Sequence, residues 1–298
     1  MNADEPATTS ALEPPRLRAT VYTGRWPQLP DGGTFSPTTS TLVTGPTEAV
    51  LIDAQYLKAD VQDLGDLIER TGKQLTTVFV THGHADHYLG FVPLLARFPG
   101  ARCVALPGVI EYMDQHMDRQ NEQWTYMFGD ATVQGGPLPD PLEGSTLHVD
   151  GSPLNVIEVE QADISPTTIV HVPELDLVAA GDAVYNEIHM MLGLSTPQQW
   201  QDWIATIDLV EGLRPRRIVA GHCRPDSDDH AATSMLHQSR TYVQDFATAY
   251  VTADDADELI AEMTAKYPHH GNLWTLQFSA QAAVRRRDRA RNTGAQIG

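Results

Sequence analysis

The sequence is poor in cysteine, in basic side chains and in long apolar stretches, and each deficit excludes a class of protein. Cys103 and Cys223 are the only two cysteines among 298 residues, too few for the disulfide framework of a small secreted domain. No apolar run reaches the roughly 20 residues that a membrane-spanning helix needs. The opening residues 1–16 lack the basic and apolar regions of a secretory signal. We therefore expect a flexible N-terminal lead-in over residues 1–16, a cytoplasmic protein and two reduced thiols.

Basic side chains are outnumbered by acidic ones, because Lys and Arg total 20, Asp and Glu total 39, and the formal net charge is -19. A surface of this charge repels phosphate backbones and anionic lipid headgroups. We therefore expect no nucleic-acid partner and no membrane partner, and a small-molecule substrate instead. Hydrophobic residues make up 41% of the chain, which is enough to form a sizeable core.

Strand-like and helix-like segments alternate along the chain, which favours a layered α/β fold. Strand patterns occur at 17–23, 40–43, 49–52, 76–80, 102–106, 146–149, 155–159, 167–172, 177–180 and 217–220. Helical patterns occur at 88–98, at 107–123 and from about residue 227 to the end. A further helix has Pro197 in its first turn, and Ser195 or Thr196 is expected to cap it.

The strongest chemical signal is the run His82-Gly83-His84-Ala85-Asp86-His87, which directly follows a buried-strand pattern. Imidazole and carboxylate are good ligands for zinc and other first-row divalent ions. A tight loop at a strand end can point these groups into one pocket, whereas a helix would spread them around its axis. The alternative is a histidine-rich loop exposed to solvent.

Two later residues strengthen the metal interpretation. Asp182 in GDAVYN and His222 in AGHC each follow a short apolar strand and a glycine, where the backbone can turn sharply. Alone, an aspartate after a strand is more often a turn or helix cap, and a single histidine there is more often structural. Their order after the HGHADH run favours one shared site.

This order of motifs resembles the metallo-β-lactamase superfamily of hydrolases, over roughly residues 17–223. The resemblance implies a four-layer αββα sandwich over residues 17–226, with a helical C-terminal extension over residues 227–298 packed on the same domain. It also implies two neighbouring metal sites. In the resemblance, His82 and His84 serve the first site, Asp86, His87 and His222 serve the second, and Asp182 bridges them.

The sequence departs from the family pattern at one ligand of the first site. Members normally supply another histidine between the HxHxDH run and the bridging aspartate, and the stretch 159–168 contains none. Gln161 stands where that histidine is expected, and Asp163 could substitute as an oxygen ligand. Because glutamine is a poor zinc ligand and aspartate a harder one, the first site is expected to be weakened, oxygen-rich or empty.

The resemblance implies a zinc-dependent hydrolase with one or two ions, and iron or manganese also remain open. A bound metal lowers the pKa of its water toward about 7, so that a metal-bound hydroxide can attack an ester, lactone, thioester or related electrophile. Asp86 would be a ligand and also a proton acceptor and donor for the leaving group. The chain has no G-x-S-x-G, P-loop or G-x-G-x-x-G pattern, so no serine nucleophile and no organic cofactor are expected.

Two alternatives stay open from the sequence. A mononuclear iron centre with two histidines and one carboxylate would support an oxidoreductase or dioxygenase on the same fold. A non-catalytic ligand-binding protein would keep a degenerate first metal site.

Residues after the bridging aspartate are expected at the mouth of the pocket. Tyr185 or His189 could hydrogen-bond a substrate oxygen, or both could belong to a packed connection. The aromatic cluster 124–128 could cover the pocket, although core packing is slightly favoured. Trp274 and Phe278 are expected to anchor the core rather than to contact substrate.

Three further expectations concern the surroundings of the site. Asp53, at the end of a strand, is expected to hydrogen-bond the metal loop. Cys223, next to His222, is expected to be a buried thiol rather than a ligand. Residues 227–291 could close over the site or form a homodimer interface.

Overall fold

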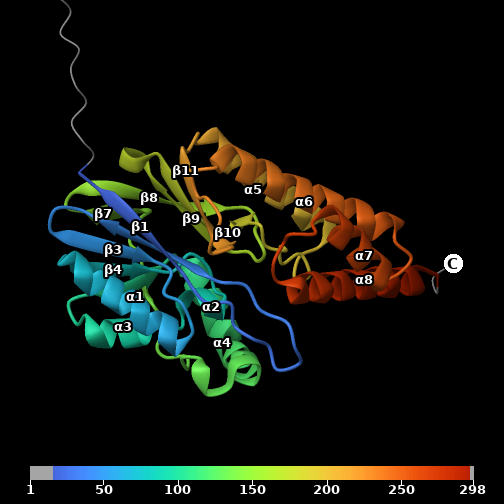
Figure 1. Ribbon diagram of the computed structural model, residues 1–298, viewed down its shortest axis with the longest axis horizontal. Coiled ribbons are helices and arrows are strands. Elements are labelled where there is room, and N and C mark those ends of the chain that lie inside the picture. Colours follow the sequence, from blue (N-terminus) through green and yellow to red (C-terminus); the bar gives the residue numbers. More distant parts are fainter. Residues whose placement is uncertain (1–15, 296–298) are drawn as a thin grey trace, which may run out of the picture.

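Two β-sheets lie face to face, and helices cover both outer faces, as the computed structural model shows (Figure 1). It describes residues 16–295, so the lead-in expected at the N-terminus lies almost wholly outside the described residues. The first sheet has the strand order β1-β2-β3-β4-β5-β6, and the second has the order β11-β10-β9-β8-β7. This arrangement confirms the αββα sandwich.

The elements alternate as the sequence pattern predicts. The first sheet contains β1 (Arg18–Thr23), β2 (Thr39–Thr44), β3 (Glu48–Ile52), β4 (Gln74–Phe79), β5 (Arg102–Ala105) and β6 (Asp140–Pro141). The second contains β7 (Thr146–Val149), β8 (Ser152–Val159), β9 (Thr167–Val172), β10 (Leu177–Asn186) and β11 (Arg217–Cys223). The helices are α1 (Lys58–Thr71), α2 (Ala85–Tyr88), α3 (Phe91–Arg97), α4 (Pro107–Phe128), α5 (Pro197–Gly212), α6 (Ala232–Thr252), α7 (Ala256–Lys266) and α8 (Leu273–Ala295).

The core consists of three apolar clusters, one at each interface between layers. The first joins the outer face of the first sheet to α1, α3 and α4, the second fills the space between the sheets, and the third joins the second sheet to α5–α8. Strand β3 shows how the sequence builds two of them. Val50 and Ile52 belong to the cluster between the sheets, whereas Ala49 and Leu51 belong to the helix side, because successive strand residues point to opposite faces.

The two sheets meet at one edge, and this edge positions the chemistry. Strands β3 and β4 run parallel, as do β10 and β11, so the residues after β3 and β4 lie at the same end of the first sheet. Isolated bridges join His82 to Thr167 and Thr38 to His222 across this edge. The metal motif is thereby brought next to the ends of β10 and β11.

Three local predictions are corrected or refined. The helix predicted over 88–98 is two helices, α2 and α3, because the Gly90 N–H donates to the Gln55 carbonyl (2.8 Å) and the His87 carbonyl accepts from the Ala54 N–H (2.7 Å) instead of bonding within one helix. Helix α4 extends beyond residue 123 to Phe128. Thr196, not Ser195, caps α5, in a capping box with Gln199.

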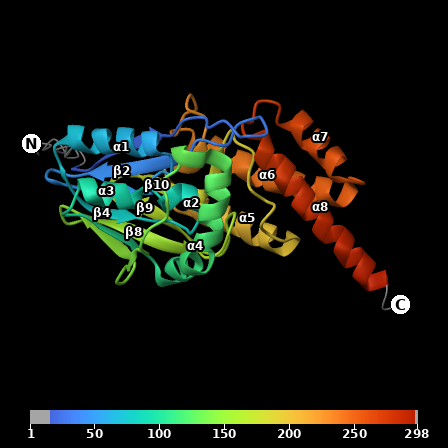
Figure 2. The ribbon, with the colours of Figure 1, turned by 90° about the horizontal axis from the view of Figure 1, so that it is seen from below.

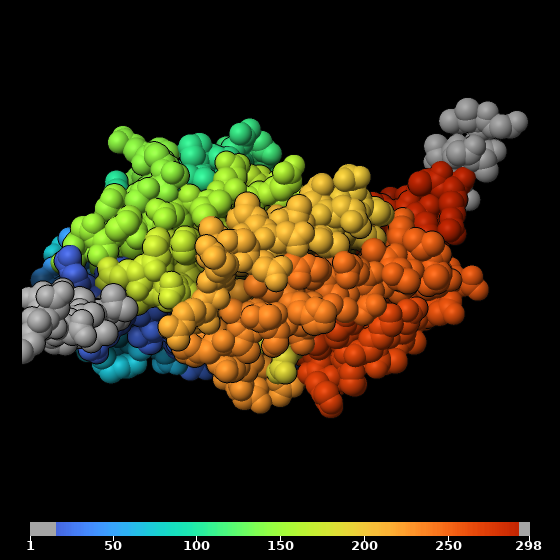
Figure 3. Space-filling view, turned by 90° about the horizontal axis from the view of Figure 1, so that it is seen from above, coloured from blue at the N-terminus to red at the C-terminus, as the bar shows by residue number. Residues whose placement is uncertain are grey.

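Helices α5 and α6 cover the second sheet, and α7 and α8 continue from them away from the sandwich (Figures 1 and 2). The space-filling view from above shows that the surface formed by α5 to α8, coloured gold to red, continues without a break from the second sheet to the C-terminal helices (Figure 3). Among the described helices, none has the length and apolarity that crossing a membrane requires.

Candidate metal centre

A buried hydrogen-bond relay fixes the loop between β4 and α2. Asp53, directly after β3, accepts hydrogen bonds from the Thr81 backbone N–H (2.9 Å), the Thr81 hydroxyl (2.9 Å) and Nδ1 of His87 (2.9 Å). Because the Thr81 hydroxyl gives its proton to Asp53, it accepts from Nδ1 of His82 at 3.0 Å. The relay thus leaves Nε2 of both His82 and His87 free, and Asp53 occupies the supporting position that the sequence predicts.

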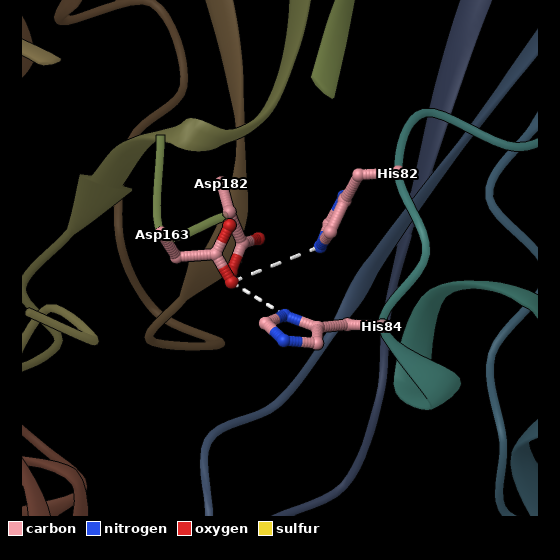
Figure 4. Close-up of side chains that lie close together, drawn as sticks. All are labelled: His82, His84, Asp163 and Asp182. Atoms are coloured by element: carbon pink, nitrogen blue, oxygen red, sulfur yellow. Dashed lines mark ion pairs between the residues drawn. The ribbon is translucent and has the colours of Figure 1, made fainter. Parts of the chain in front are cut away.

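The first ligand group contains His82, His84, Asp163 and Asp182, whose candidate ligand atoms all lie within 4.8 Å of one another. Figure 4 shows Asp163 approaching both histidines from the segment after β8. Its Oδ2 lies 2.5 Å from Nδ1 of His84 and 4.0 Å from Nε2 of His82, while its Oδ1 accepts the Ile164 N–H at 2.7 Å. The structure therefore places a carboxylate where family members normally supply a histidine.

The second ligand group contains Asp86, His87 and His222. His222 donates from Nδ1 to the Pro37 carbonyl (3.1 Å), so its Nε2 faces Asp86 Oδ2 at 3.4 Å. The Thr38 hydroxyl donates to the same Asp86 oxygen at 3.2 Å. His222 is held in the same way as His82 and His87, with Nε2 directed into the cluster.

Asp182 stands between the two groups. Its Oδ1 lies 3.1 Å from Nε2 of His87, and its Oδ2 lies 3.3 Å from Nε2 of His222. The Tyr185 hydroxyl donates to Oδ2 at 2.5 Å. A Cβ at Gly221 would lie 2.1 Å from Oδ1, so the glycine of the GH pair is needed to admit this carboxylate.

Burial and mutual charge set the protonation of the cluster. Burial, reinforced by the neighbouring His87, lowers the pKa of His82 to about 3, which keeps it in the neutral form that binds metal. Burial acts to raise the pKa of Asp182, but His222 and His87 outweigh this effect and hold that pKa well below its usual range. In the first group, Asp182 is thus held ionised and His82 neutral, whereas burial acts to lower the pKa of His84 but the charge of Asp163 outweighs this effect and raises it.

The residues fit a divalent metal. Within residues 16–295, four buried atoms at the centre of the cluster make no hydrogen bond of suitable geometry, although each lies within 4.0 Å of another ligand atom: Nε2 of His82, Nε2 of His87, Oδ2 of Asp163 and Oδ1 of Asp182. An unsatisfied buried polar atom costs about 1–3 kcal/mol. Nitrogen and oxygen lone pairs that converge in this way suit zinc, iron or manganese.

A cavity of about 350 Å³ reaches the cluster, because His84, Asp86, Asp163, Asp182 and His222 all line it. Its other lining residues come from α4, from α8, from the end of β10 and the segment after it, and from the segment between β1 and β2. The volume lies at the small end of the range for ligand pockets.

The structure brings together all six residues assigned by the motifs: His82, His84, Asp86, His87, Asp182 and His222. Of the two candidates for the missing ligand, Asp163 reaches the cluster and Gln161 does not contact it. The Gln161 amide donates to the Ala162 carbonyl at 2.8 Å and accepts from the Gln199 amide at 3.0 Å. Gln161 therefore faces helix α5, which corrects its tentative placement at the metal.

Of the two residues expected at the pocket mouth, only Tyr185 lines the cavity. His189 is buried elsewhere: its Nδ1 lies 2.9 Å from the Tyr242 hydroxyl, and its ring lies 5.5 Å from that of His270. The His189 side chain points toward α6 although Met191 and Leu194, a few residues further on, line the cavity, so proximity to Asp182 in sequence does not bring His189 to it.

The aromatic predictions also need correction. Trp274 and Phe278 line the cavity rather than only anchoring the core, because α8 packs along its rim. In the cluster 124–128, Trp124 and Met127 line the cavity while packing in the core, whereas Tyr126 is 73% exposed.

The cysteines lie outside both ligand groups. Cys223 follows His222 in β11, and its sulfur lies 3.6 Å from the Thr23 hydroxyl. Neighbouring strand residues point to opposite faces, which explains why the thiol does not reach the cluster. Cys103 is buried in the core.

Sequence reasoning missed two residues of helix α4. Gln120 is buried and bridges the metal loop, accepting from the Ala85 N–H and donating to the Gly83 carbonyl, both at 2.7 Å. Arg119 lines the cavity beside it. Helical spacing could have predicted that Arg119 and Tyr112 lie on the same face of the helix, but the sequence does not show that this face meets the site.

Comparison with known proteins agrees with this geometry. The family model of the metallo-beta-lactamase superfamily matches residues 33–222. A metallo-beta-lactamase family protein from Thermus thermophilus aligns with 18% identity and a TM-score of 0.62, over 92% of this chain and 93% of that one. A metallo-beta-lactamase from Pontibacter korlensis aligns with 19% identity and a TM-score of 0.56, over 76% and 99%.

The metallo-beta-lactamase IND-7 aligns with 17% identity and a TM-score of 0.55, over 80% of this chain and 100% of its own. No curated protein sequence matches the chain. At these identities the solved structures support the fold alone, while the family model spans more than half of the residues and ends at the last candidate ligand, His222. The chain therefore belongs to the metallo-beta-lactamase superfamily.

Proposed function

We propose that the chain is a metal-dependent hydrolase, with zinc as its ion, that acts on a small or medium ester, lactone or thioester. The observation that carries this proposal is the convergence of unpartnered ligand atoms from two groups beside a cavity with apolar walls. A substrate carbonyl in that cavity can approach both ligand groups at once.

The two groups would each hold one ion. His82, His84 and Asp163 would hold the first, His87, His222 and Asp86 would hold the second, and Asp182 would contact both. Bound divalent ions lower the pKa of water and polarise a carbonyl oxygen, and this is the chemistry they supply.

The chain's own side chains would supply orientation and proton transfer. Asp86, which lines the cavity and accepts from Thr38, would take the proton of the attacking water and return it to the leaving group. Burial, and then the charge of Asp182, raise the pKa of Tyr185 well above its usual value. Tyr185 therefore stays protonated, so its hydroxyl holds Asp182 in place and presents a donor at the cavity wall.

Metal analysis combined with a substrate panel tests the proposal. Protein purified without chelator should contain one or two zinc ions and should hydrolyse at least one ester, lactone or thioester. Asp86→Asn should lower kcat by about a hundredfold or more, the size of a typical general-base contribution. Asp114→Asn, an exposed carboxylate of α4 outside the cavity lining, is the matched control. A metal-loaded protein that hydrolyses none of these classes would contradict the proposed function.

One observation favours a second candidate, an iron oxidoreductase. Asp163 gives the first group two histidines and a non-bridging carboxylate, a donor set that also suits iron(II). Iron in the purified protein, together with oxygen consumption in the presence of a reductant, would favour this candidate over the hydrolase.

A further inference from the structure

One face of helix α4 presents a polar stripe to the cavity. Tyr112, His116, Arg119 and Gln123 all line it, and their spacing of four, three and four residues places them on one side of a helix. The His116 ring stacks on Tyr112 with centroids 4.1 Å apart, and its Nδ1 donates to the Tyr112 carbonyl. The stripe is therefore an ordered wall.

Another part of the lining is apolar. Trp274 and Phe278 of α8 stack with centroids 5.6 Å apart and an interplanar angle of 16°. Met191 and Leu194, from the segment after β10, extend this surface, and Leu194 is 45% exposed. The cavity is thus amphipathic across its width.

Arg119 is the only Lys or Arg side chain among the cavity-lining residues. It is exposed, and within residues 16–295 it has no hydrogen bond or ion pair. By contrast, Arg97 and Arg240 each pair with two carboxylates. An unpaired guanidinium is thus directed to the cavity of a chain whose net charge is -19.

Arg119 lies close to the metal centre along α4. Its neighbour Gln120 is bonded to Gly83 and Ala85, on either side of the ligand His84. Tyr112 lines the same cavity as Arg119, His84 and Asp163. Burial and the charge of Asp163 raise the pKa of Tyr112 to about 12, and the charge of Arg119 opposes this rise. Because one cavity is lined by both the ligand groups and the guanidinium, a ligand bound in it can contact both.

We propose that the cavity takes a carbonyl substrate with an apolar body and a free carboxylate, and that Arg119 binds this carboxylate. The proposal rests on the proposed hydrolase function and narrows its substrate class. The apolar body packs on Trp274 and Phe278 while the electrophilic carbonyl faces the ligand groups. A single guanidinium matches the charge and forked geometry of a carboxylate, and no other Lys or Arg side chain lines the cavity.

Ligand binding can be measured without turnover, because Trp124 and Trp274 line the cavity and report by fluorescence. The probes are N-phenylsuccinamate and N-phenylsuccinamide, amides that differ only in carboxylate against carboxamide. Metal-loaded wild type should bind the carboxylate more tightly. Arg119→Gln should reduce that preference about tenfold, the size of one charge-assisted contact, and Arg119→Lys should restore part of it. Arg70→Gln, an exposed arginine of α1 outside the lining, is the control.

Two esters extend the test to turnover: monobenzyl succinate, which keeps a free carboxylate, and benzyl succinamate, which carries a carboxamide in its place. Arg119→Gln should raise the ratio of the KM for monobenzyl succinate to the KM for benzyl succinamate about tenfold. A wild type without carboxylate preference, or an Arg119→Gln variant that keeps it, would overturn the proposal. Hydrolysis without a preference for the carboxylate over the carboxamide would support the hydrolase function and overturn only the proposed carboxylate site. Binding with the Arg119-dependent preference but no hydrolysis of any ester, lactone or thioester supports the carboxylate site and overturns the hydrolase function.

Discussion

Asp53 is predicted to set the proton positions on two histidines that belong to different ligand groups. Its Oδ2 accepts from Nδ1 of His87 directly and reaches Nδ1 of His82 through the Thr81 hydroxyl. Both bonds keep the ring proton on Nδ1 and leave Nε2 as a lone pair for a metal. A substitution that preserves the shape of Asp53 but replaces one acceptor oxygen by a hydrogen-bond donor should therefore disturb both ligand groups.

Asp53→Asn is that change. If the amide nitrogen takes the place of Oδ2, it donates toward His87 Nδ1 and toward Thr81. Thr81 must then donate to His82, and the ring protons of both histidines move to Nε2, where they block metal binding. If the amide is turned round, its NH₂ instead faces the Thr81 backbone N–H, and two donors meet in a buried site.

The expected effect is large at both groups. Loss of a carboxylate that supports a ligating histidine typically costs 10–100-fold in metal affinity, so we expect a loss of about that size for each ion. The apo-protein should also lose about 1.5–3 kcal/mol of unfolding free energy, the usual contribution of a hydrogen bond to a charged group.

Zinc affinity measured by competition with a chromophoric chelator, with both binding steps resolved, is the assay. Thr81→Val keeps the shape of the side chain and breaks only the link to His82, so it should weaken the first group and spare the second. Asp114→Asn again serves as the exposed control. Wild-type affinity at both steps in Asp53→Asn would refute the tautomer reasoning, and equal losses at both steps in Thr81→Val would refute the relay through that hydroxyl.

Two other substitutions separate the candidates for the missing ligand. Asp163→His exchanges an oxygen donor for a nitrogen donor beside His84. It should therefore raise zinc affinity relative to manganese affinity about tenfold or more in a metal competition assay. An unchanged ratio of the two affinities would mean that residue 163 does not bind the ion. Gln161→Leu should leave both zinc affinities unchanged, because that amide faces Gln199, and a weakened first step in the same titration would contradict its placement away from the metal.

The sequence predicts the fold and most of the metal cluster, because both depend on local signals. Apolar patterns mark the strands, and the HGHADH run puts four candidate ligands, His82, His84, Asp86 and His87, within six residues, from the loop after β4 into α2. Asp182 and His222 lie far along the chain but carry their own signal, a glycine after an apolar strand pattern. The predicted strand ends at 180 and 220 are wrong, because β10 and β11 continue past both glycines and the chain adjusts at Gly181 by a shift in register. Asp163 lacks such a signal, so only tertiary structure decides between it and Gln161.

The pocket could not be predicted in the same way. Trp274 and Phe278 have a spacing that suits a core anchor equally well, and only the packing of α8 places them on the cavity. Closeness in sequence to Asp182 predicts His189 at the pocket mouth, but the His189 side chain contacts Tyr242 instead. Which face of a helix meets a site is decided by contacts between elements far apart in the chain.

Asp163 makes the two ligand groups chemically alike. With Asp182 shared, each group offers two imidazole nitrogens and two carboxylate oxygens, so ligand type gives neither group an advantage for a particular ion. Any difference in metal binding between the two groups must then come from solvent access to the ligands and from the hydrogen bonds that orient them. His84 lines the cavity and is partly exposed, whereas His87 is fully buried and held by Asp53. Both groups reach the cavity, the first through His84 and Asp163 and the second through Asp86 and His222, so the difference is that the first group alone has a partly exposed side chain, His84.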